Sequence, residues 1–343
     1  MKDIDIRVKK RAGRITLQRP NALNAITYDM CNAIEHALLA WRENDTIDLI
    51  VIDALGDRAF CAGGDIAELY DTGKAGNFKF GQQFWADEYR LNALISDYPK
   101  PYVALMQGFT MGGGVGISCH GSHRIVSESS QIAMPECGIG LVPDVGGSDI
   151  LARAPGHVGA YLGLTAQRMG PSDAIYVGFA DNFIVQNSWV KLTKELEETG
   201  NIAILQSYYQ TPPDGVLKGQ IDSINRFFGT PILADIVTSL IDDDSKFAQN
   251  ALKAMRRNSP LSMACALHII DHLRTSSGGL HEALNWEYRF TARSMEYGDF
   301  IEGIRAAIID KDRKPDWKHA IMGVPADAIG RMLAPFGKNK LRL

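Results

Sequence analysis

Two carboxylates, Glu136 and Asp144, lie among the glycines of the stretch 111–150. Glycine loses much backbone entropy on folding and fills no volume, so a glycine-rich stretch favours close approach of backbone N–H groups to a ligand. The spacing of the two acids could fold both over one pocket, where burial and repulsion would separate their pKa values. One acid could then act as base or nucleophile toward a carbonyl, and the other as an orienting acid. The alternative is that each acid caps a helix, and Asp144 is well placed to cap one over 145–153.

Two glycine loops, each following a predicted strand, strengthen the case for an active site. The first contains Gly63-Gly64, and the second contains Gly112-Gly113-Gly114. Two backbone N–H groups aimed at one point would stabilise charge on a carbonyl oxygen, as in an oxyanion hole. Alternatively, the glycines permit tight turns or close helix–sheet packing. The dinucleotide fingerprint, the phosphate-binding loop and the Gly-x-Ser-x-Gly motif of hydrolases are missing from the sequence.

The cysteines and histidines give weaker signals. The five cysteines are scattered and form no C-x-x-C pair, which favours a reduced compartment over a disulfide framework. Cys61 and Cys137 adjoin the glycine loops and could be nucleophiles, but free cysteine is more often buried filler. We expect no metal site.

Periodicity predicts the elements that must position these residues. We expect strands over 4–8, 14–17, 48–53, 102–106, 123–126 and 179–185. Helices are predicted over 27–41, 66–70, 78–96, 145–153, 156–164 and 172–177, with Thr27 and Asp65 as caps of the first two. Further helices are expected over 191–198, 232–241, 246–257, 261–273, 280–295 and 300–309. The pattern indicates an α/β core over 1–190 and an α-helical region over 191–343 packed on it.

Bulk composition narrows the partners and the compartment. Hydrophobic residues make up 45% of the 343 residues, charged residues 22%, and the net charge is −4. These are ordinary values for a globular protein and give no reason to expect nucleic acid or an anionic membrane as partner. No apolar run is long enough to span a bilayer, and the N-terminus lacks the features of a targeting segment. We therefore expect a cytoplasmic protein.

Three motifs in this order resemble the crotonase (enoyl-CoA hydratase/isomerase) superfamily. They are Pro20-Asn21-Ala22-Leu23-Asn24-Ala25, Phe60-Cys61-Ala62-Gly63-Gly64-Asp65-Ile66 and Gly112-Gly113-Gly114. The finer pattern resembles the 3-hydroxyisobutyryl-CoA hydrolase subfamily, through Met134-Pro135-Glu136 and Gly140-Leu141-x-Pro143-Asp144-Val145-Gly146-Gly147. The resemblance implies an α/β fold with a ββα spiral core and a C-terminal α-helical region.

The resemblance also assigns site residues. It implies that the thioester oxygen of an acyl-CoA lies between the N–H groups of Gly64 and Gly113. The paired catalytic carboxylates fall on Glu136 and Asp144, and a further acid that contacts substrate falls on Glu88. Contacts to CoA would come from residues of the first and second of these motifs: Ala22, Asn24, Ala62, Gly64, Asp65 and Ile66. The resemblance implies no cofactor beyond the CoA of the substrate, and it allows a homo-oligomer.

Gly116 discriminates between the activities of the superfamily. True hydratases carry a catalytic Glu two residues after the third glycine, where this chain has Gly116. The resemblance therefore favours hydrolysis of 3-hydroxyisobutyryl-CoA to 3-hydroxyisobutyrate and CoA in valine breakdown, with Glu136 as nucleophile or general base. Two alternatives remain: an enoyl-CoA hydratase or isomerase that uses Glu136 alone, and a non-catalytic acyl-CoA-binding protein. The pair Ser148-Asp149 departs from the hydrolase pattern, where aromatic residues commonly follow the glycine pair, so the acyl group accepted stays open.

Overall fold

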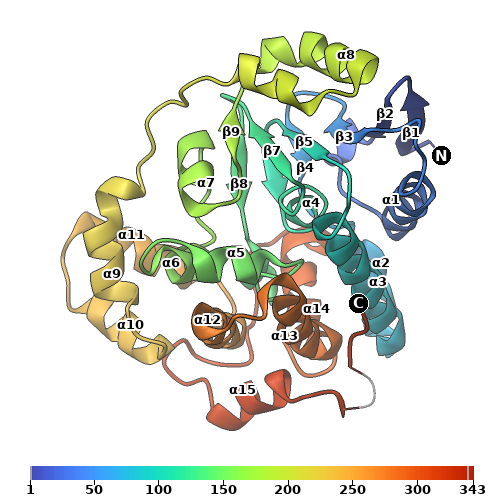
Figure 1. Cartoon of the computed structure of the whole chain (residues 1–343). Coiled ribbons are helices and arrows are strands. Elements are labelled where there is room, and N and C mark those ends of the chain that lie inside the picture. Colours follow the sequence, from blue (N-terminus) through green and yellow to red (C-terminus); the bar gives the residue numbers. More distant parts are fainter. Residues whose placement is uncertain (1, 338–339) are drawn as a thin grey trace. The chain divides into compact units, whose positions relative to one another are not determined.

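The structure, a computed structural model, describes residues 2–337 and 340–343, and Figure 1 labels its helices and strands. The chain divides into two compact units. Unit 1 consists of Met1–Asp65, Arg90–Ala133 and Arg168–Val216. Unit 2 consists of Ile66–Tyr89, Met134–Gln167 and Leu217–Leu343. The units interleave along the sequence, and the predicted division into a core over 1–190 and a helical region over 191–343 packed on it stays a prediction.

Unit 1 is built on a six-stranded sheet of order β1-β2-β3-β5-β7-β9. The strands are β1 (Ile4–Lys9), β2 (Ala12–Leu17), β3 (Leu49–Ala54), β5 (Tyr102–Met106), β7 (His123–Val126) and β9 (Asn182–Phe183). β1 and β2 form the predicted antiparallel hairpin, and all the other pairs are parallel. The continuous apolar runs of β3 and β5 are buried, as expected for parallel strands that are covered on both faces.

Helices cover both faces of this sheet within unit 1. On one face, Ala12 of β2 and buried residues of β3, β5 and β7 form an apolar cluster with residues of α8 (Trp189–Thr199) and η4 (Ile202–Tyr208). Gly13, one residue along, points to the other face, where a Cβ would lie 2.5 Å from the ring of Trp41. Trp41 ends α1 (Tyr28–Trp41), which Thr27 caps as predicted by accepting the Met30 N–H at 3.2 Å. The result is a layered α/β arrangement.

A second, smaller sheet in unit 1 carries the glycine loops. It consists of the parallel strands β4 (Ala59–Cys61), β6 (Phe109–Met111) and β8 (Gln131–Ala133). The short helical segments of unit 1 are η1 (Pro20–Ala22), α4 (Gly113–Gly116), α7 (Pro171–Val177) and η3 (Gln186–Ser188). Three-residue strands are too short to show a period-2 pattern, so β4 and β6 were not predicted.

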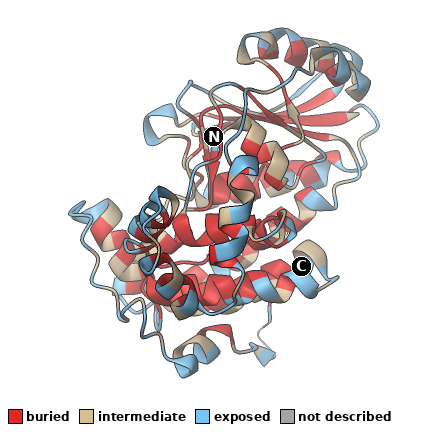
Figure 2. Ribbon diagram, turned by 90° about the vertical axis from the view of Figure 1, so that its left-hand side faces the viewer, coloured by how far each residue is buried: buried red, intermediate tan, exposed pale blue. Residues whose placement is uncertain are grey.

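Unit 2 is α-helical, and Figure 2 shows that helices of the chain carry both buried and exposed residues. α12 (Pro260–Thr275) is buried along most of its length and packs against α5 (Gly147–Arg153), α6 (Val158–Thr165) and α13 (Gly279–Ser294). The other helices are α2 (Ala67–Lys74), η2 (Glu136–Ile139), η5 (Lys218–Gln220), α9 (Ile221–Phe228), α10 (Leu233–Ile241), α11 (Lys246–Met255), α14 (Phe300–Ile304), the π-helix η6 (Arg305–Ile309) and α15 (Ala326–Leu333). α3 (Phe78–Ser96) contributes residues to both units and has the predicted bounds.

Some predicted elements differ from the structure. The Asp65 cap is wrong, because α2 begins at Ala67 without a side-chain cap and Asp65 instead pairs with Arg19 at 2.9 Å. The predicted helix over 300–309 changes from α-helix to π-helix at Arg305. The helices α9 and α15 were not predicted, and the predicted strand over 179–185 is reduced to the two residues of β9. The α/β fold class is confirmed.

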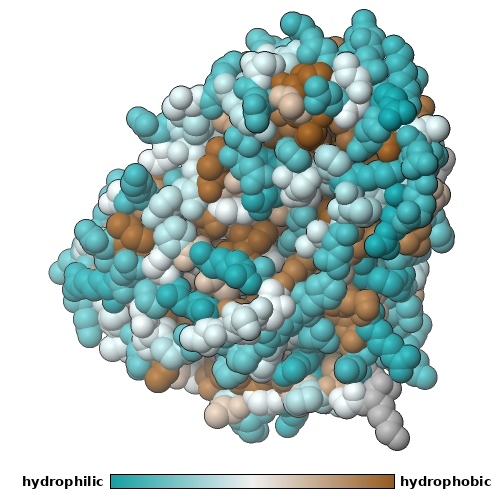
Figure 3. All heavy atoms as spheres, in the orientation of Figure 1, coloured by the Kyte–Doolittle hydropathy of each residue, from teal (hydrophilic) through white to brown (hydrophobic). Residues whose placement is uncertain are grey.

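Among the described residues, no helix combines the length and the apolar character that crossing a membrane requires. The face drawn in Figure 3 is mainly hydrophilic, with separate apolar patches between polar side chains.

Candidate active site

The two glycine loops lie side by side in unit 1. β4 and β6 are neighbouring parallel strands, with Cys61 paired to Thr110, so the loops that follow them leave the small sheet at the same edge. Gly112 has φ +48° and ψ −122°, a conformation that side chains strongly disfavour. A Cβ on Gly114 would lie 2.3 Å from the Cys61 carbonyl oxygen. Gly114 thus serves close packing, which was the alternative interpretation of these glycines, and the packing brings the loops together.

The N–H groups of Gly64 and Gly113 are not used to hold these loops. In the first loop, Ala62 donates to the Leu23 carbonyl and Asp65 donates to the Ile26 carbonyl. Gly113 is the first residue of α4, where N–H groups lack an intrahelical acceptor. In the described part of the chain, neither N–H donates to a loop or turn carbonyl. Their role as an oxyanion hole stays a prediction.

A cluster of buried carboxyl groups lies in unit 2 and contains the predicted acids. Glu88 comes from α3, Glu136 from the start of η2, and Asp144 from the loop before α5. The Tyr89 hydroxyl donates to Asp144 Oδ2 at 2.8 Å and lies 3.3 Å from the Thr291 hydroxyl. Glu136 Oε2 is buried and has no hydrogen-bond partner among the described residues. An unpartnered buried carboxyl oxygen is costly, which points to a functional role.

Burial and mutual repulsion raise the pKa values in this cluster. Burial raises the pKa of Glu136 well above its ordinary value, and the charge of Asp144 raises it further. Burial also raises the pKa of Glu88 to about 8, again with a contribution from Asp144. For Asp144, burial raises the pKa to about 7, while the hydrogen bond from Tyr89 lowers it. The ionisation of each of these groups therefore depends on the charge of its neighbours.

Asp144 does not cap a helix, so that alternative is wrong. α5 begins at Gly147 with Gly146 as its cap residue, and no side chain caps it. Asp144 contributes only its carbonyl, which accepts the Gly147 N–H at 2.7 Å, while its side chain meets Tyr89. The next residue, Val145, has φ +51°, which is an outlier for a β-branched residue. Strained backbone of this kind clusters at functional sites.

Glu287 holds the turn that follows Asp144, and it was not predicted from the sequence. This fully buried residue of α13 accepts the N–H of Gly146 at 2.8 Å and that of Ser148 at 3.1 Å. It also accepts a hydrogen bond from the Ser148 hydroxyl, so the departure from the family pattern at Ser148 supplies a hydrogen bond between α5 and α13. Burial raises the pKa of Glu287 to about 8, although these hydrogen bonds lower it. The available signal was a carboxylate on the buried face of a predicted helix, in register with Leu284 and Thr291.

The residues predicted to contact CoA differ in their exposure to solvent. Asn24 is buried and its side chain is occupied, because it accepts the Arg19 N–H and donates to the Leu55 and Ala59 carbonyls. Its backbone N–H donates to the Arg19 carbonyl at 2.8 Å, so its own carbonyl is the polar group left for a ligand. Ala22 is exposed, and Ala62, Gly64, Asp65 and Ile66 are partly exposed, with Ile66 in unit 2 and the others in unit 1. Contact of these residues with CoA stays a prediction.

The cysteines and one pair of histidines are held in structural surroundings. All five cysteines are buried, and in the described part of the chain none forms a disulfide. Burial raises the pKa of Cys137 well above its ordinary value, which opposes a nucleophilic thiolate. His268 and His272 are spaced four residues apart on α12, but His272 lies 2.9 Å from Glu282 and its ring is tilted against that of Trp286. In the described part of the chain, no three His, Cys, Asp or Glu side chains are grouped so that they could hold a metal ion.

Comparisons with known proteins agree on the family. A family model described as enoyl-CoA hydratase/isomerase matches residues 12–333. A relative from Danio rerio, named 3-hydroxyisobutyryl-CoA hydrolase, mitochondrial, is 38% identical over 97% of this chain and 90% of that protein. The superfamily and subfamily predicted from the motifs are thereby confirmed. The predicted cytoplasmic location is wrong, because the curated relatives of this name are mitochondrial.

Solved structures share the whole fold. One from Rhodobacter sphaeroides 2.4.1, described as an enoyl-CoA hydratase, is 52% identical with a TM-score of 0.95, over 99% of this chain and 100% of that chain. Another from Mycobacterium thermoresistibile, described as a carnitinyl-CoA dehydratase, is 34% identical with a TM-score of 0.94, over 100% of this chain and 99% of that chain. The names of these similar proteins therefore cover more than one reaction on CoA thioesters.

Proposed function

The chain belongs to the enoyl-CoA hydratase/isomerase family, and we propose that it is an acyl-CoA thioester hydrolase that acts on 3-hydroxyisobutyryl-CoA. Water enters, the C–S bond of the thioester breaks, a C–O bond forms, and CoA leaves as the free thiol. The observation that carries the proposal is the buried pair Glu136 and Asp144, with the Tyr89 hydroxyl on Asp144. The biological context that we propose is valine breakdown.

Two backbone N–H groups, those of Gly64 and Gly113, would polarise the thioester carbonyl. Negative charge develops on its oxygen when the carbonyl carbon is attacked, and each well-placed donor contributes roughly a hundredfold to a thousandfold to the rate of such reactions. The adjacency of the two loops in unit 1 supports this assignment. A thioester is already activated, so the proposal calls on no metal or redox cofactor.

The carboxyl cluster would supply the attack. Glu136 acts as a nucleophile, through an anhydride with the acyl group, or as the base that activates water. Burial and the charge of Asp144 raise the pKa of Glu136, which strengthens its carboxylate as a base toward water. Asp144, whose pKa burial raises to about 7, would assist proton transfer or hold the hydroxyl of the substrate. Glu88 would line the space for the acyl group.

A second candidate function is that of an enoyl-CoA hydratase or isomerase that uses Glu136 alone. The likeness to the Rhodobacter sphaeroides structure, an enoyl-CoA hydratase by name at 52% identity, favours it. Gly116 counts against this second candidate. It occupies the position of the second acid of hydratases, and it is buried and has no carboxyl group. Addition of water across a double bond would then lack one of its two acids.

A thiol-release assay tests the proposal. Wild type, Glu136→Gln and Asp144→Asn are each given 3-hydroxyisobutyryl-CoA, and the free thiol of CoA is measured. We expect wild type to release thiol and both variants to lose at least about a hundredfold in kcat, the effect typical of removing a catalytic acid or base. Hydrolysis that both variants carry out unimpaired would contradict the mechanism. A wild-type protein that binds the ester and releases no thiol would indicate a non-catalytic acyl-CoA-binding protein.

A further inference from the structure

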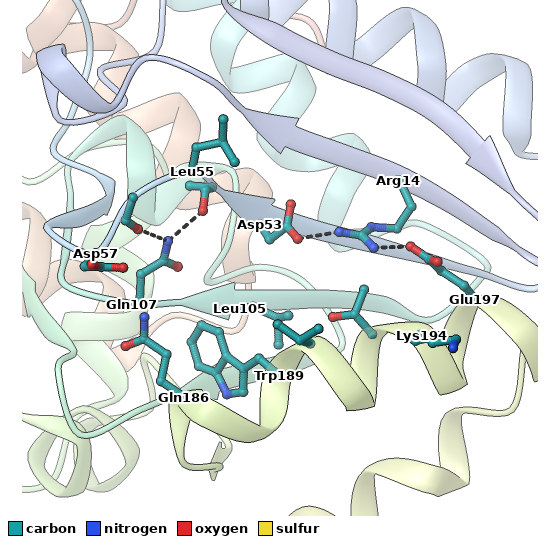
Figure 4. Close-up of a pocket in the computed structure, with 14 residues that line it drawn as sticks. Arg14, Asp53, Leu55, Asp57, Leu105, Gln107, Gln186, Trp189, Lys194 and Glu197 are labelled. Atoms are coloured by element: carbon teal, nitrogen blue, oxygen red, sulfur yellow. Dashed lines mark hydrogen bonds and ion pairs between the residues drawn. The ribbon is translucent and has the colours of Figure 1, made fainter.

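A cleft in unit 1 lies between the large sheet and α8, apart from the glycine loops (Figure 4). It is lined by Arg14 of β2, by Asp53 at the end of β3, by Leu105 of β5, by Gln107 just after β5, and by one side of α8. Its volume is 500 Å³, within the roughly 300–1,000 Å³ of small-molecule sites. Residues 54–57 and Gln107 place it at the carboxyl ends of two neighbouring parallel strands, where α/β sheets commonly bind ligands.

The polar groups of this cleft are held rigidly, yet several of their atoms have no partner. Arg14 is 4% exposed and forms ion pairs with Asp53 and Glu197. Gln107, also 4% exposed, donates its amide hydrogens to the Ala54 and Gly56 carbonyls at 2.8 and 3.0 Å. Three buried atoms are left without a hydrogen-bond partner among the described residues: Arg14 Nε, Asp53 Oδ1 and Gln107 Oε1. Such atoms are costly unless something binds them.

The unpartnered atoms indicate what chemistry would complete the cleft. Asp53 Oδ1 and Gln107 Oε1 are acceptors and require N–H or O–H donors. The charged residues of the lining are the cations Arg14 and Lys194 and the anions Asp53, Asp57 and Glu197, which leave one net negative charge. Trp189 and Leu105 add buried apolar surface. A ligand with an ammonium group on a small apolar body matches the acceptors, the charge and the apolar wall together.

We propose that this cleft is a binding site for a small molecule that carries a primary ammonium group next to an apolar body. The ammonium donates to Asp53 Oδ1 and Gln107 Oε1, and the apolar body lies against Leu105 and Trp189. Simple amines and α-amino acids share this chemistry. An α-amino acid would in addition place its carboxylate within reach of the Lys194 ammonium or Arg14 Nε.

Three matched probes test the site on the full-length protein: 3-methylbutylamine, leucine and 4-methylpentanoate. All three probes share the same branched apolar body. 3-Methylbutylamine adds an ammonium group, leucine adds an ammonium and a carboxylate, and 4-methylpentanoate adds a carboxylate alone. Binding is measured by isothermal titration and by saturation-transfer NMR. We expect the amine to bind and 4-methylpentanoate not to bind. Leucine that binds at least as tightly as the amine identifies amino acids as the ligand class, and leucine that fails to bind identifies simple amines.

Two variants locate the binding. Asp53→Asn, with its folding checked by circular dichroism, should weaken amine binding by about tenfold or more, because it removes a charged hydrogen-bond acceptor. Val190→Trp should block the mouth of the cleft from a position that is 83% exposed, where folding tolerates the change. Val216→Trp, at an exposed valine outside the cleft, is the matched control and should bind as wild type does.

Three results would overturn the proposal. The first is that no ammonium probe binds, which means that water alone satisfies the cleft. The second is that 4-methylpentanoate binds as tightly as the amine, or that both Asp53→Asn and Val190→Trp leave amine affinity unchanged. The third is that Val190→Trp changes the oligomeric state measured by light scattering, because the cleft would then be covered by a second copy of the chain.

Discussion

Replacing Tyr89 by phenylalanine removes one hydroxyl from the carboxyl cluster and tests whether Asp144 must be ionised for activity. The hydroxyl donates to Asp144 Oδ2 at 2.8 Å, and this hydrogen bond lowers an Asp144 pKa that burial raises to about 7. A hydrogen bond to a charged group contributes about 1.5–3 kcal/mol, which corresponds to about one to two pH units. We therefore expect the pKa of Asp144 to rise by about one to two units in Tyr89→Phe.

The assay is kcat/KM for thiol release as a function of pH. Activity that needs ionised Asp144 rises as the pH passes the pKa of this group, so the rising limb should move to higher pH in Tyr89→Phe. At pH values above the shifted limb, the rate should return close to that of wild type. Tyr288→Phe is the matched control, because Tyr288 stacks edge-on against Tyr89 with ring centroids 6.4 Å apart while its hydroxyl lies 3.3 Å from the Gln82 carbonyl. A limb that stays in place in Tyr89→Phe, or a loss of activity that is equal at every pH, would refute the reasoning.

Two further predictions concern stability. The pKa of Glu287 is raised from 4.5 to about 8 in the folded protein, so the stability that its protonated form contributes is full below pH 4.5 and is lost as the pH rises through 8. The free energy of unfolding in urea should therefore fall more steeply over this range in wild type than in Glu287→Gln, and equal slopes would speak against a raised pKa. Gly114→Ala should lower the free energy of unfolding by about 1–3 kcal/mol, because its Cβ would lie 2.3 Å from the Cys61 carbonyl oxygen. Gly219→Ala, where nothing lies within 4 Å of the added Cβ, is the control, and a Gly114→Ala protein as stable as this control would exclude the close packing.

Local sequence signals were sufficient for the long elements. α1 and α3 were predicted because their apolar residues recur at helical spacing, and β3 and β5 because their apolar runs are continuous. The short strands β4 and β6 could not be predicted, although they bring the glycine loops together. Their pairing joins residues about fifty positions apart and leaves no local trace in the sequence.

The candidate site was predicted only in part, because some of its contacts join residues that are far apart in the sequence. Glu136 and Asp144 stood out because they lie among glycines, and Glu88 came from the family resemblance alone. Glu287 is separated from the turn that it holds by more than a hundred residues, so only the folded chain reveals that contact. The cap assigned to Asp65 failed because its partner, Arg19, lies in a distant loop and competes with the local helix for the carboxylate.

The most direct test of the proposed function compares two substrates of wild type that share one carbon skeleton. One is 3-hydroxyisobutyryl-CoA, and the other is 2-methylpropenoyl-CoA, which differs from it by the loss of water. Release of free thiol and addition of water to the double bond are followed in parallel by chromatography of the CoA products. We predict release of thiol from the hydroxyacyl ester, with kcat/KM at least about a hundredfold above that for addition of water to the enoyl ester. Rapid addition of water to 2-methylpropenoyl-CoA, with no thiol released from either ester, would contradict hydrolysis as the function of this protein.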